Sequence, residues 1–483
     1  MNFSIVLKYL GYFLIVEGLF LLPSMFVSVI YSETNTIFSF LISIALCIIV
    51  GFLFQFFTKK AETTLRIKES FAIAGLGWII ISLFGALPFW ISKEIPSYLD
   101  AWFETVSGFT TTGSSILTDV ESLSKGLLFW RSFTHWLGGM GVLVFLLTLV
   151  KSKRGEGYSL HLLRAESPGP QVEKLLPKTR DSARITYLLY IGLSIINLLF
   201  LLAGKMPLLD AFCIMFGTAG TGGFGIKNSS LADYSTYLQT VTTIFMALFG
   251  VNFSIYFLLV SKQWKEALKD EELRLYIGIM LSAIALCALP LIINGSMGIL
   301  NAIHHSAFTV SSIMTTTGYA TVDFDQWTQF AKTVLLVIMI FGAMAGSTGG
   351  GIKTSRIIIV IKSIKAQIYK LLHPRSVKYV TMNGKPLDSI IINRTFLYLS
   401  IYAIILIFSV LLVSLDNFSM ETTLSAVLSC LNNIGPGLDA VGPTSNFSVF
   451  SNFSKLILSF DMLLGRLELL PLIVLLIPST WRN

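Results

Sequence analysis

The sequence Thr110-Thr111-Thr112-Gly113-Ser114 returns almost unchanged as Thr315-Thr316-Thr317-Gly318-Tyr319. Each copy follows a segment that is too short and too polar to cross a bilayer, and each precedes a long apolar segment. Two more divergent copies are Thr221-Gly222-Gly223-Phe224 and Asn432-Asn433-Ile434-Gly435-Pro436. Their central glycines are 110, 95 and 117 residues apart, so the chain contains four diverged copies of one unit: helix, half-helix, glycine turn, helix.

The composition around these turns is typical of a membrane protein. Of the 483 residues, 54% are hydrophobic and 13% are charged, whereas soluble domains contain about 25% charged residues. Ten apolar segments are long enough to cross the hydrocarbon core of a bilayer. They lie at residues 5–30, 37–57, 71–92, 126–150, 184–204, 236–261, 275–294, 330–361, 395–415 and 451–478. We therefore expect about ten spanning helices, of which the first two stand outside the repeats.

The charged residues indicate how these helices are oriented. The net charge of +8 comes from Lys and Arg in four loops, which the positive-inside rule places in the cytoplasm. Most of the acidic residues fall in the remaining loops, on the outer side. This distribution reports topology, and we do not expect nucleic acid as a partner. The four cysteines are far apart in apolar surroundings, and we interpret them as small buried side chains.

The glycine turns suggest ion binding. Irregular backbone at membrane depth must be buried in protein or line a watery cavity. Glycine allows successive carbonyl groups to point toward one axis, as a K⁺ selectivity filter requires, and half-helices ending there direct the negative ends of their dipoles at the cation. For any single glycine, helix packing or an ordinary turn is the simpler explanation, but neither explains four equivalent placements. The predicted filter residues are Thr111, Thr112, Gly113, Ser114, Thr221, Gly222, Gly223, Phe224, Thr316, Thr317, Gly318, Tyr319, Asn433, Ile434, Gly435 and Pro436.

These turns resemble the Trk/Ktr/HKT superfamily of potassium transporters, in particular the membrane subunits of bacterial Trk systems. His135-Trp136-Leu137-Gly138-Gly139-Met140-Gly141, Gly346-Ser347-Thr348-Gly349-Gly350-Gly351-Ile352-Lys353 and Gly465-Arg466-Leu467-Glu468 add to the resemblance, which covers essentially the whole chain. It implies a homodimer in the bacterial inner membrane with one pore per subunit and a cytoplasmic TrkA-type ring of nucleotide-binding subunits. The transported ion is K⁺, with no organic cofactor in this chain. The register of the second turn rests on matching Gly223-Phe224 to the family's Gly-Phe.

The predicted fold is thus an all-α membrane protein with two N-terminal helices and four helix–pore-helix–filter–helix repeats, arranged with pseudo-fourfold symmetry around one pore. The N-terminal helices occupy residues 1–68. The repeats occupy residues 69–151, 183–262, 272–365 and 390–483. Residues 151–184 and 362–394 are the basic loops that a cytoplasmic ring would bind.

The segment at 330–361 contains a glycine-rich stretch from Gly342 to Gly351 that no ordinary helix would tolerate. A phosphate-binding P-loop is excluded because Ile352 separates Gly351 from Lys353 and no strand precedes the stretch. The resemblance implies an intramembrane gate loop over residues 342–353, beneath the filter; a packing kink is the alternative. The predicted gate residues are Gly346, Ser347, Thr348, Gly349, Gly350, Gly351 and Lys353.

Arg466 lies within an apolar segment, where an arginine costs roughly 2.5–3.5 kcal/mol. The resemblance places it in the ion path below the filter. The alternatives are snorkelling or an ion pair with a carboxylate such as Asp461 or Glu468.

The sequence is less consistent with two other functions than with a channel-like K⁺ uptake protein. A secondary symporter coupling K⁺ to H⁺ or Na⁺ would be expected to contain inverted repeats, whereas these four run in the same direction. A membrane enzyme or receptor is disfavoured because no loop is large enough for a catalytic domain, and we do not expect an enzyme.

Overall fold

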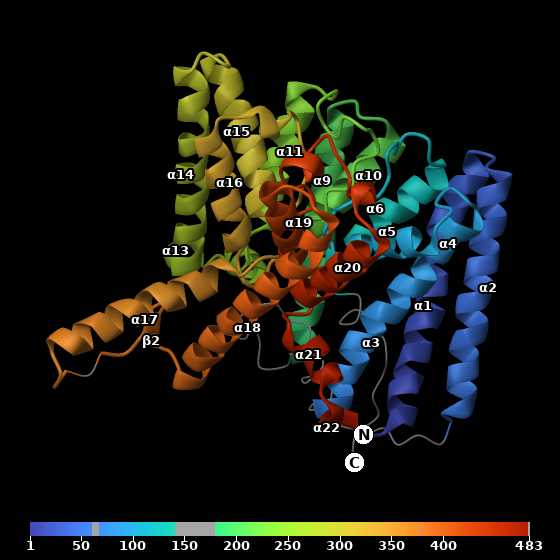
Figure 1. Cartoon of the computed structure of the whole chain (residues 1–483), viewed down its shortest axis with the longest axis horizontal. Coiled ribbons are helices and arrows are strands. Elements are labelled where there is room, and N and C mark those ends of the chain that lie inside the picture. Colours follow the sequence, from blue (N-terminus) through green and yellow to red (C-terminus); the bar gives the residue numbers. More distant parts are fainter. Residues whose placement is uncertain (60–66, 140, 142–178, 377, 482–483) are drawn as a thin grey trace.

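The computed structural model describes residues 1–59, 67–139, 141, 179–376 and 378–481. Apart from one small hairpin, these residues form helices and turns (Figure 1). The helices are α1 Phe3–Ile30, α2 Thr34–Phe57, α3 Ile67–Gly85, α4 Leu87–Ile91, α5 Tyr98–Phe109, α6 Lys125–Gly139, α9 Thr179–Ala203, α10 Leu208–Gly220, α11 Thr236–Phe249, α12 Phe253–Val260, α13 Trp264–Lys269, α14 Glu271–Ile293, α15 Ile299–Met314, α16 Gln329–Phe341, α17 Thr354–Leu372, α18 Ser389–Val413, α19 Met420–Asn432, α20 Asn452–Arg466, α21 Leu470–Leu476 and α22 Pro478–Trp481. The hairpin pairs β1 Thr381–Met382 with β2 Lys385–Pro386.

The two N-terminal helices, α1 and α2, form an antiparallel pair at one edge of the molecule (Figure 1). Their backbones approach closely where two glycines meet, because a methyl group built on Gly11 would lie 2.9 Å from the carbonyl oxygen of Gly51. Small residues at such crossings replace the hydrophobic driving force that is missing in lipid. The other face of α1 packs against α3 and α6, which attaches the pair to the first repeat.

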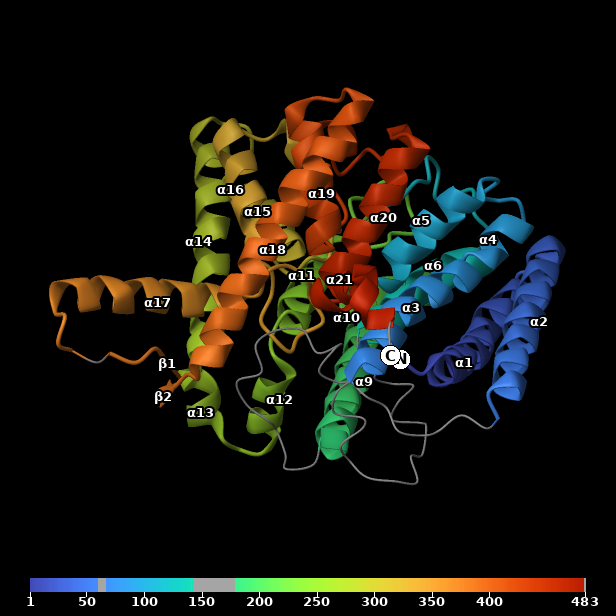
Figure 2. The same cartoon turned by 60° about the horizontal axis from the view of Figure 1, so that its bottom comes forward.

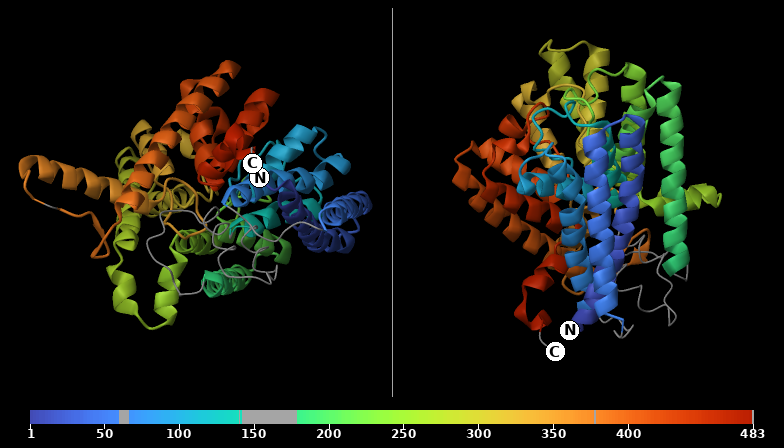
Figure 3. Two further views of the ribbon diagram at one scale, coloured as in Figure 1. Left: turned by 90° about the horizontal axis from the view of Figure 1, so that it is seen from below. Right: turned by 90° about the vertical axis from the view of Figure 1, so that its right-hand side faces the viewer.

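The rest of the chain follows the fourfold unit. A long helix, a short helix and a final helix succeed one another as α3 with α5 and α6, α9 with α10 and α11, α14 with α15 and α16, and α18 with α19 and α20. Figure 2 shows these groups following one another around a common centre. The two chain ends lie at the same end of the molecule (Figure 3), where the ring of Phe3 stacks on Trp481 at 5.9 Å.

Not all of the ten predicted apolar segments are continuous helices in the part of the chain that the structure describes. Six helical spans in the described part of the chain are long and apolar enough to cross a membrane, and they are the N-terminal pair and the first helix of each repeat. They cover Phe3–Ile30, Thr34–Phe57, Lys68–Ile91, Arg184–Ala203, Glu271–Ile293 and Ser389–Asp416. A seventh span results if α11 and α12 are counted together, although they meet at 94°.

The breaks fall in the last helices of the second, third and fourth repeats. The predicted span 236–261 bends between Phe249 and Phe253, where the Asn252 side chain caps α12 by accepting from the Ser254 N–H at 2.8 Å. The predicted span 451–478 breaks directly after Arg466, where Glu468 and Leu469 both have positive φ. Apolar composition continues through both breaks, so hydropathy alone cannot detect them. The continuation of α6 beyond residue 141 lies outside the described residues.

The break predicted at 342–353 is present, because α16 ends at Phe341 and α17 begins at Thr354. Beyond it, α17 runs sideways away from the bundle (Figure 1). The hairpin that follows α17 returns to the start of α14, where Asn383 donates from Nδ2 to the Asp270 carboxylate at 2.8 Å. The Lys362 ammonium pairs with Glu271 beside it.

Candidate functional site

The four short helices α5, α10, α15 and α19 end in the same way. In each, the first residue after the helix or after its cap takes a left-handed conformation: φ is 56° at Thr111, 53° at Thr221, 60° at Thr316 and 57° at Asn433. The N–H of the next residue then donates to the carbonyl five positions back. These bonds are Thr112 to Ser107 at 2.9 Å, Gly222 to Gly217 at 2.8 Å, Thr317 to Ser312 at 2.8 Å and Ile434 to Ser429 at 2.9 Å. Three of the four left-handed residues are β-branched threonines, for which this conformation is unfavourable and requires support from the surroundings.

One residue further on, each turn contains a glycine with positive φ. The values are 85° at Gly113, 75° at Gly223, 88° at Gly318 and 108° at Gly435. Gly223 therefore occupies in the second turn the conformation that the other three glycines occupy in theirs. The neighbouring glycine Gly222 does not have a positive φ, so it is not the equivalent of Gly113, Gly318 and Gly435.

The four turns meet in a ring. A methyl group built on Gly113 would strike the carbonyl oxygen of Gly222, one on Gly223 that of Thr317, and one on Gly318 that of Ile434. A methyl group on Gly435 would lie 2.9 Å from the carbonyl oxygen of Thr112, which closes the ring. Each contact is with the residue immediately before the next glycine, in the order first, second, third, fourth and first repeat. Two separate features thus require glycine at each position: the positive φ, and the neighbouring carbonyl oxygen that leaves no room for a Cβ atom.

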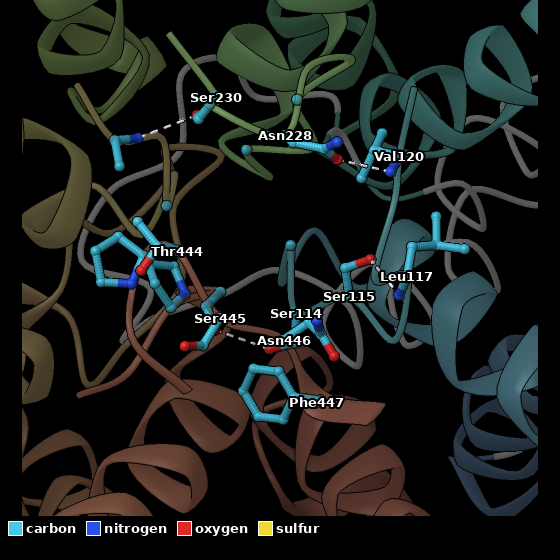
Figure 4. A pocket seen from close by; sticks show the side chains of 18 of the residues that line it. Ser114, Ser115, Leu117, Val120, Asn228, Ser230, Thr444, Ser445, Asn446 and Phe447 are labelled. Atoms are coloured by element: carbon cyan, nitrogen blue, oxygen red, sulfur yellow. Dashed lines mark hydrogen bonds between the residues drawn. The ribbon is translucent and has the colours of Figure 1, made fainter. Parts of the chain in front are cut away.

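One side of the ring opens into a cavity of about 150 Å³. All four ring glycines line it, together with the loops that follow the turns, and Figure 4 shows this lining. Hydrogen bonds join the loops to one another: Ser114 Oγ donates to the Gly435 carbonyl at 3.0 Å, and the Val120 N–H donates to Asn228 Oδ1 at 2.8 Å. The Phe447 N–H donates to the Ser115 carbonyl at 2.8 Å.

Acidic residues stand near the rim of this cavity. Asp439 follows the fourth turn, and its carboxylate accepts from the hydroxyls of Ser419 at 2.5 Å and Thr422 at 2.6 Å. These two hydrogen bonds lower the pKa of Asp439 below its ordinary value, because they stabilise the charged form. Asp325 accepts from the Asp439 N–H at 3.2 Å. Lys332 pairs with Asp325 at 3.4 Å and Lys227 lines the cavity, so the rim carries charges of both signs.

The other side of the ring is covered by the loop between α16 and α17, residues 342–353. The Gly350 N–H donates to Thr316 Oγ1 at 2.6 Å, and the Gly351 N–H donates to the Asn432 carbonyl at 3.1 Å. A methyl group on Gly349 would lie 2.8 Å from the Thr315 carbonyl oxygen. The loop thus lies directly against the inner ends of the third and fourth turns. The Lys353 ammonium donates to the Gly349 carbonyl within the loop.

The same loop also packs against the break between α11 and α12. The Met344 N–H donates to the Gly250 carbonyl at 3.1 Å, the Phe253 N–H donates to the Gly346 carbonyl at 3.1 Å, and Thr348 Oγ1 donates to the Phe249 carbonyl at 3.2 Å. The carbonyl and amide groups released by one broken helix therefore bind those released by another. This exchange satisfies polar backbone groups that would otherwise be costly at membrane depth.

Arg466 ends α20 beside this loop. Its Nη1 donates to the Thr348 carbonyl at 3.0 Å and to Thr111 Oγ1 at 3.2 Å, and its Nη2 donates to the carbonyls of Gly138 at 2.5 Å and Gly139 at 2.8 Å. Glu468, named above as a candidate partner, binds the Arg356 guanidinium at 2.6 Å, and Asp461 accepts from Ser409 Oγ at 2.7 Å. Arg466 is therefore directed at the first turn and the loop.

Several residues that hold these parts in place were not predicted from the sequence. Glu104 and Arg131 form a buried ion pair of 2.6 Å behind the first and second turns, and Glu272 accepts from both ends of the 342–353 loop. His135 was considered only as part of a packing motif, although its imidazole contacts two turns. The available signal was a charged or polar residue within an apolar helix. The glycines of that motif do allow close approach, since a methyl group on Gly139 would lie 2.6 Å from the Cα of Gly220.

In the described part of the chain, no group of three or more His, Cys, Asp or Glu side chains is placed to hold a metal ion. The four cysteines are buried and unpaired with one another, as expected. The polar groups that the ring offers to a ligand are backbone carbonyls and threonine hydroxyls. Such oxygen ligands suit a hard cation.

Comparison with known proteins agrees with this architecture. The family model TrkH, described as a cation transport protein, matches residues 36–482. The chain is 32% identical over 477 residues to the Trk system potassium uptake protein TrkG of Escherichia coli (strain K12), covering 98% of this chain and 97% of that protein. It is 32% identical over 491 residues to TrkH of Salmonella typhimurium, covering all of both chains. The crystal structure of the potassium transporter TrkH from Vibrio parahaemolyticus superposes with a TM-score of 0.89 at 28% identity, over 100% of both chains.

Proposed function

The chain belongs to the TrkH family of cation transport proteins, and from this we propose that it mediates potassium uptake through a channel-like pore. The protein is a multi-pass membrane protein, and K⁺ is its transported ion. Its selectivity filter consists of the four turns, with the residues predicted above: Thr111 to Ser114, Thr221 to Phe224, Thr316 to Tyr319 and Asn433 to Pro436. The potassium uptake proteins that this chain resembles over their full length support the choice of ion.

The observation that carries the proposal is the closed ring of glycines. Four equivalent turns, each at the C-terminal end of a short helix, meet so that the glycine of one turn lies against a backbone carbonyl of the next. The negative ends of four helix dipoles meet there, which favours a cation.

We assign the gate to the 342–353 loop together with Arg466. The loop covers the inner face of the ring, and Arg466 adds a positive charge there. Opening requires the loop to leave Thr316 and Asn432, which would expose the inner mouth of the pore. A packing kink would make the same contacts with the ring but would not have to move.

The proposed partners are a second copy of this chain and a cytoplasmic TrkA-type nucleotide-binding ring. The name Trk system, which the relatives carry, implies transport by several components. Of the two basic loops assigned to ring docking, residues 151–184 lie largely outside the described residues, including Lys174 and Lys178. The other offers Lys370, Arg375 and Lys378 at the exposed end of α17 and beyond it. Charge reversal at these three residues should weaken co-purification with the ring, and undiminished co-purification would exclude this surface.

The filter assignment is tested with Gly113→Ser in liposomes containing the purified protein. The serine side chain would strike the Gly222 carbonyl and disfavour the φ of 85°, so the K⁺ to Na⁺ permeability ratio should fall by about tenfold, equivalent to ~1.4 kcal/mol of lost discrimination. Gly225→Ala is the matched control, because a methyl group on Gly225 has no neighbour closer than 3.4 Å.

An unchanged ratio in Gly113→Ser would refute the filter assignment. The same recordings address the symporter alternative. A reversal potential that follows the K⁺ gradient alone supports a channel-like pore, whereas one that shifts with an H⁺ or Na⁺ gradient supports coupled transport.

A further inference from the structure

The second turn contains more glycines than the other three. Gly220, Gly222, Gly223 and Gly225 lie within six residues, yet only Gly223 has a positive φ. Backbone conformation therefore does not explain the remaining three. For Gly220 and Gly222 the explanation lies on α6, the helix that packs against α10.

The His135 side chain of α6 occupies the space beside two of these glycines. A methyl group built on Gly222 would fall on the imidazole ring, and one on Gly220 would strike the His135 carbonyl. The imidazole is completely buried. Gly222 is thus required because the imidazole lies against the backbone of the second turn, and Gly220 because the backbone of α6 does.

The hydrogen bonds of His135 define its tautomer. Nδ1 lies 2.7 Å from the Gly108 carbonyl, which can only accept, so Nδ1 carries the proton. Nε2 lies 3.2 Å from the Phe224 backbone nitrogen, whose N–H can only donate, so Nε2 accepts. One neutral imidazole therefore connects the last turn of α5 in the first repeat to the residue after Gly223 in the second.

Arg131 lies one helical turn before His135 and holds the same segment. Its Nη1 donates to the Gly225 carbonyl at 2.8 Å, and its guanidinium carbon lies 3.5 Å from the centroid of the Phe224 ring. Its Nε donates to Glu104 at 2.6 Å. The Glu104 carboxylate also accepts from Ser115 Oγ and from the Ile116 N–H, both at 2.9 Å, directly after the first turn.

We propose that His135 and Arg131 are positioning residues that set the geometry of the second filter segment, and thereby the preference for K⁺ over Na⁺. The inference rests on the filter function proposed above. His135 binds the N–H of Phe224 and Arg131 binds the carbonyl of Gly225, so adjacent backbone groups are held from one helix. Glu104 couples this clamp to the first turn. Neither side chain touches the ion; both act through the carbonyls that do.

The experiment separates the two hydrogen bonds of the imidazole. In His135→Asn, the amide nitrogen replaces Nδ1 and keeps the bond to Gly108, but nothing accepts from Phe224. In His135→Gln, the amide oxygen reaches the position of Nε2 and can still accept from Phe224. Trp136→Phe is the matched control on α6, because it removes a hydrogen bond to Ser194 of α9 and leaves the second turn's hydrogen bonds in place.

The K⁺ to Na⁺ permeability ratio is measured in liposomes, with thermal stability measured in parallel. Loss of one hydrogen bond on the filter backbone should lower the ratio in His135→Asn by about fivefold to tenfold. His135→Gln and Trp136→Phe should keep ratios close to that of the unmodified protein. A folded His135→Asn with an unchanged ratio would overturn the proposal, as would equal losses of ratio in the Asn and Gln variants.

Arg131→Lys provides a second test if His135→Asn does not fold. Lysine retains the positive charge opposite Glu104 but has one nitrogen in place of the two that Arg131 uses, so the Gly225 carbonyl loses its donor and the ratio should fall. A folded Arg131→Lys with an unchanged ratio would refute the clamp. Gly113→Ser separates failure of this proposal from failure of the filter assignment. If Gly113→Ser lowers the permeability ratio while His135→Asn and Arg131→Lys do not, the filter assignment is kept and only the positioning role is wrong.

Discussion

Arg466 donates from Nη1 to the carbonyl oxygen of Thr348 over 3.0 Å, which binds the end of α20 to the loop that interrupts the third repeat. The same guanidinium reaches Gly138 and Gly139 at the end of α6. One cation thus bridges the first repeat, the fourth repeat and the loop. An arginine satisfies several carbonyls at once because its donors form a rigid fork.

Arg466→Ala should increase K⁺ flux. A unit charge about 6 Å from K⁺ opposes it by roughly 3 kcal/mol at an effective dielectric near 20, enough to slow passage by about a hundredfold if nothing compensates. The substitution also releases the loop from α20. Arg466→Lys, which keeps the charge but has a single nitrogen, should give a smaller increase. Rubidium uptake per folded molecule measures the effect; loss of thermal stability with no gain in flux would assign Arg466 a purely structural role.

Glu272→Ala should also raise flux in the absence of a partner. Glu272 Oε1 accepts from the Ala345 N–H at 2.7 Å and the Ser355 N–H at 2.9 Å. One buried carboxylate therefore connects the loop to the first turn of α17. Glu272→Gln keeps an acceptor oxygen and should have an intermediate effect. Glu271→Gln is the control, because Glu271 pairs with Lys362 on α17 and not with the loop. Equal flux in the Glu272→Ala and Glu271→Gln variants would show that the hydrogen bonds accepted by Glu272 do not restrain the gate loop.

Deleting Ser347 to Gly350 should open the pore and make flux less dependent on the cytoplasmic ring. The deletion removes the carbonyl that binds Arg466 and the N–H that binds Thr316. Because Arg466 and the loop act on one another, the deletion and Arg466→Ala should not be additive in a double-mutant cycle. Flux that falls or stays constant after the deletion would identify the loop as a packing kink.

Gly138→Ala should destabilise the fold, because its methyl group would strike the Phe109 carbonyl and lie 3.1 Å from Thr111 Cγ2. Overpacking of this kind costs about 1–3 kcal/mol. Gly192→Ala on α9 is the control: a methyl group there has no heavy atom within 4 Å, so alanine's higher helix propensity should leave stability equal or improved. Thermal unfolding in detergent compares the two, and equal midpoints would argue against close helix approach at Gly138.

Repetition and composition predicted much of the architecture. The Thr-Thr-Gly pattern could be recognised because each copy needs a glycine that can take a positive φ, as Gly113 and Gly318 do. The break at Gly342 was predictable because its cause lies in the local sequence. The ring order was not predictable, because it depends on which turn follows which in space.

The supporting contacts could not be predicted for a different reason. Arg131 and His135 bind backbone groups of residues 94 and 89 positions away, and no local pattern specifies such a partner. The bend after Phe249 has a similar cause, since the Gly250 carbonyl accepts a hydrogen bond from the 342–353 loop and the Phe253 N–H donates one to it. Tertiary contacts determine these features, and hydropathy remains uniform across them.

The closed ring also has a consequence for biosynthesis. One of its contacts joins Ser114 to Gly435, which are 321 positions apart, so the two turns that are most distant in the sequence complete it. A growing polypeptide leaving the ribosome carries the first three turns before the fourth has been made. Bringing such remote segments together is also the entropically slowest step. A half-synthesised or C-terminally truncated chain therefore has a gap where the fourth turn belongs, and the membrane acquires a complete pore only after the final hairpin has been inserted.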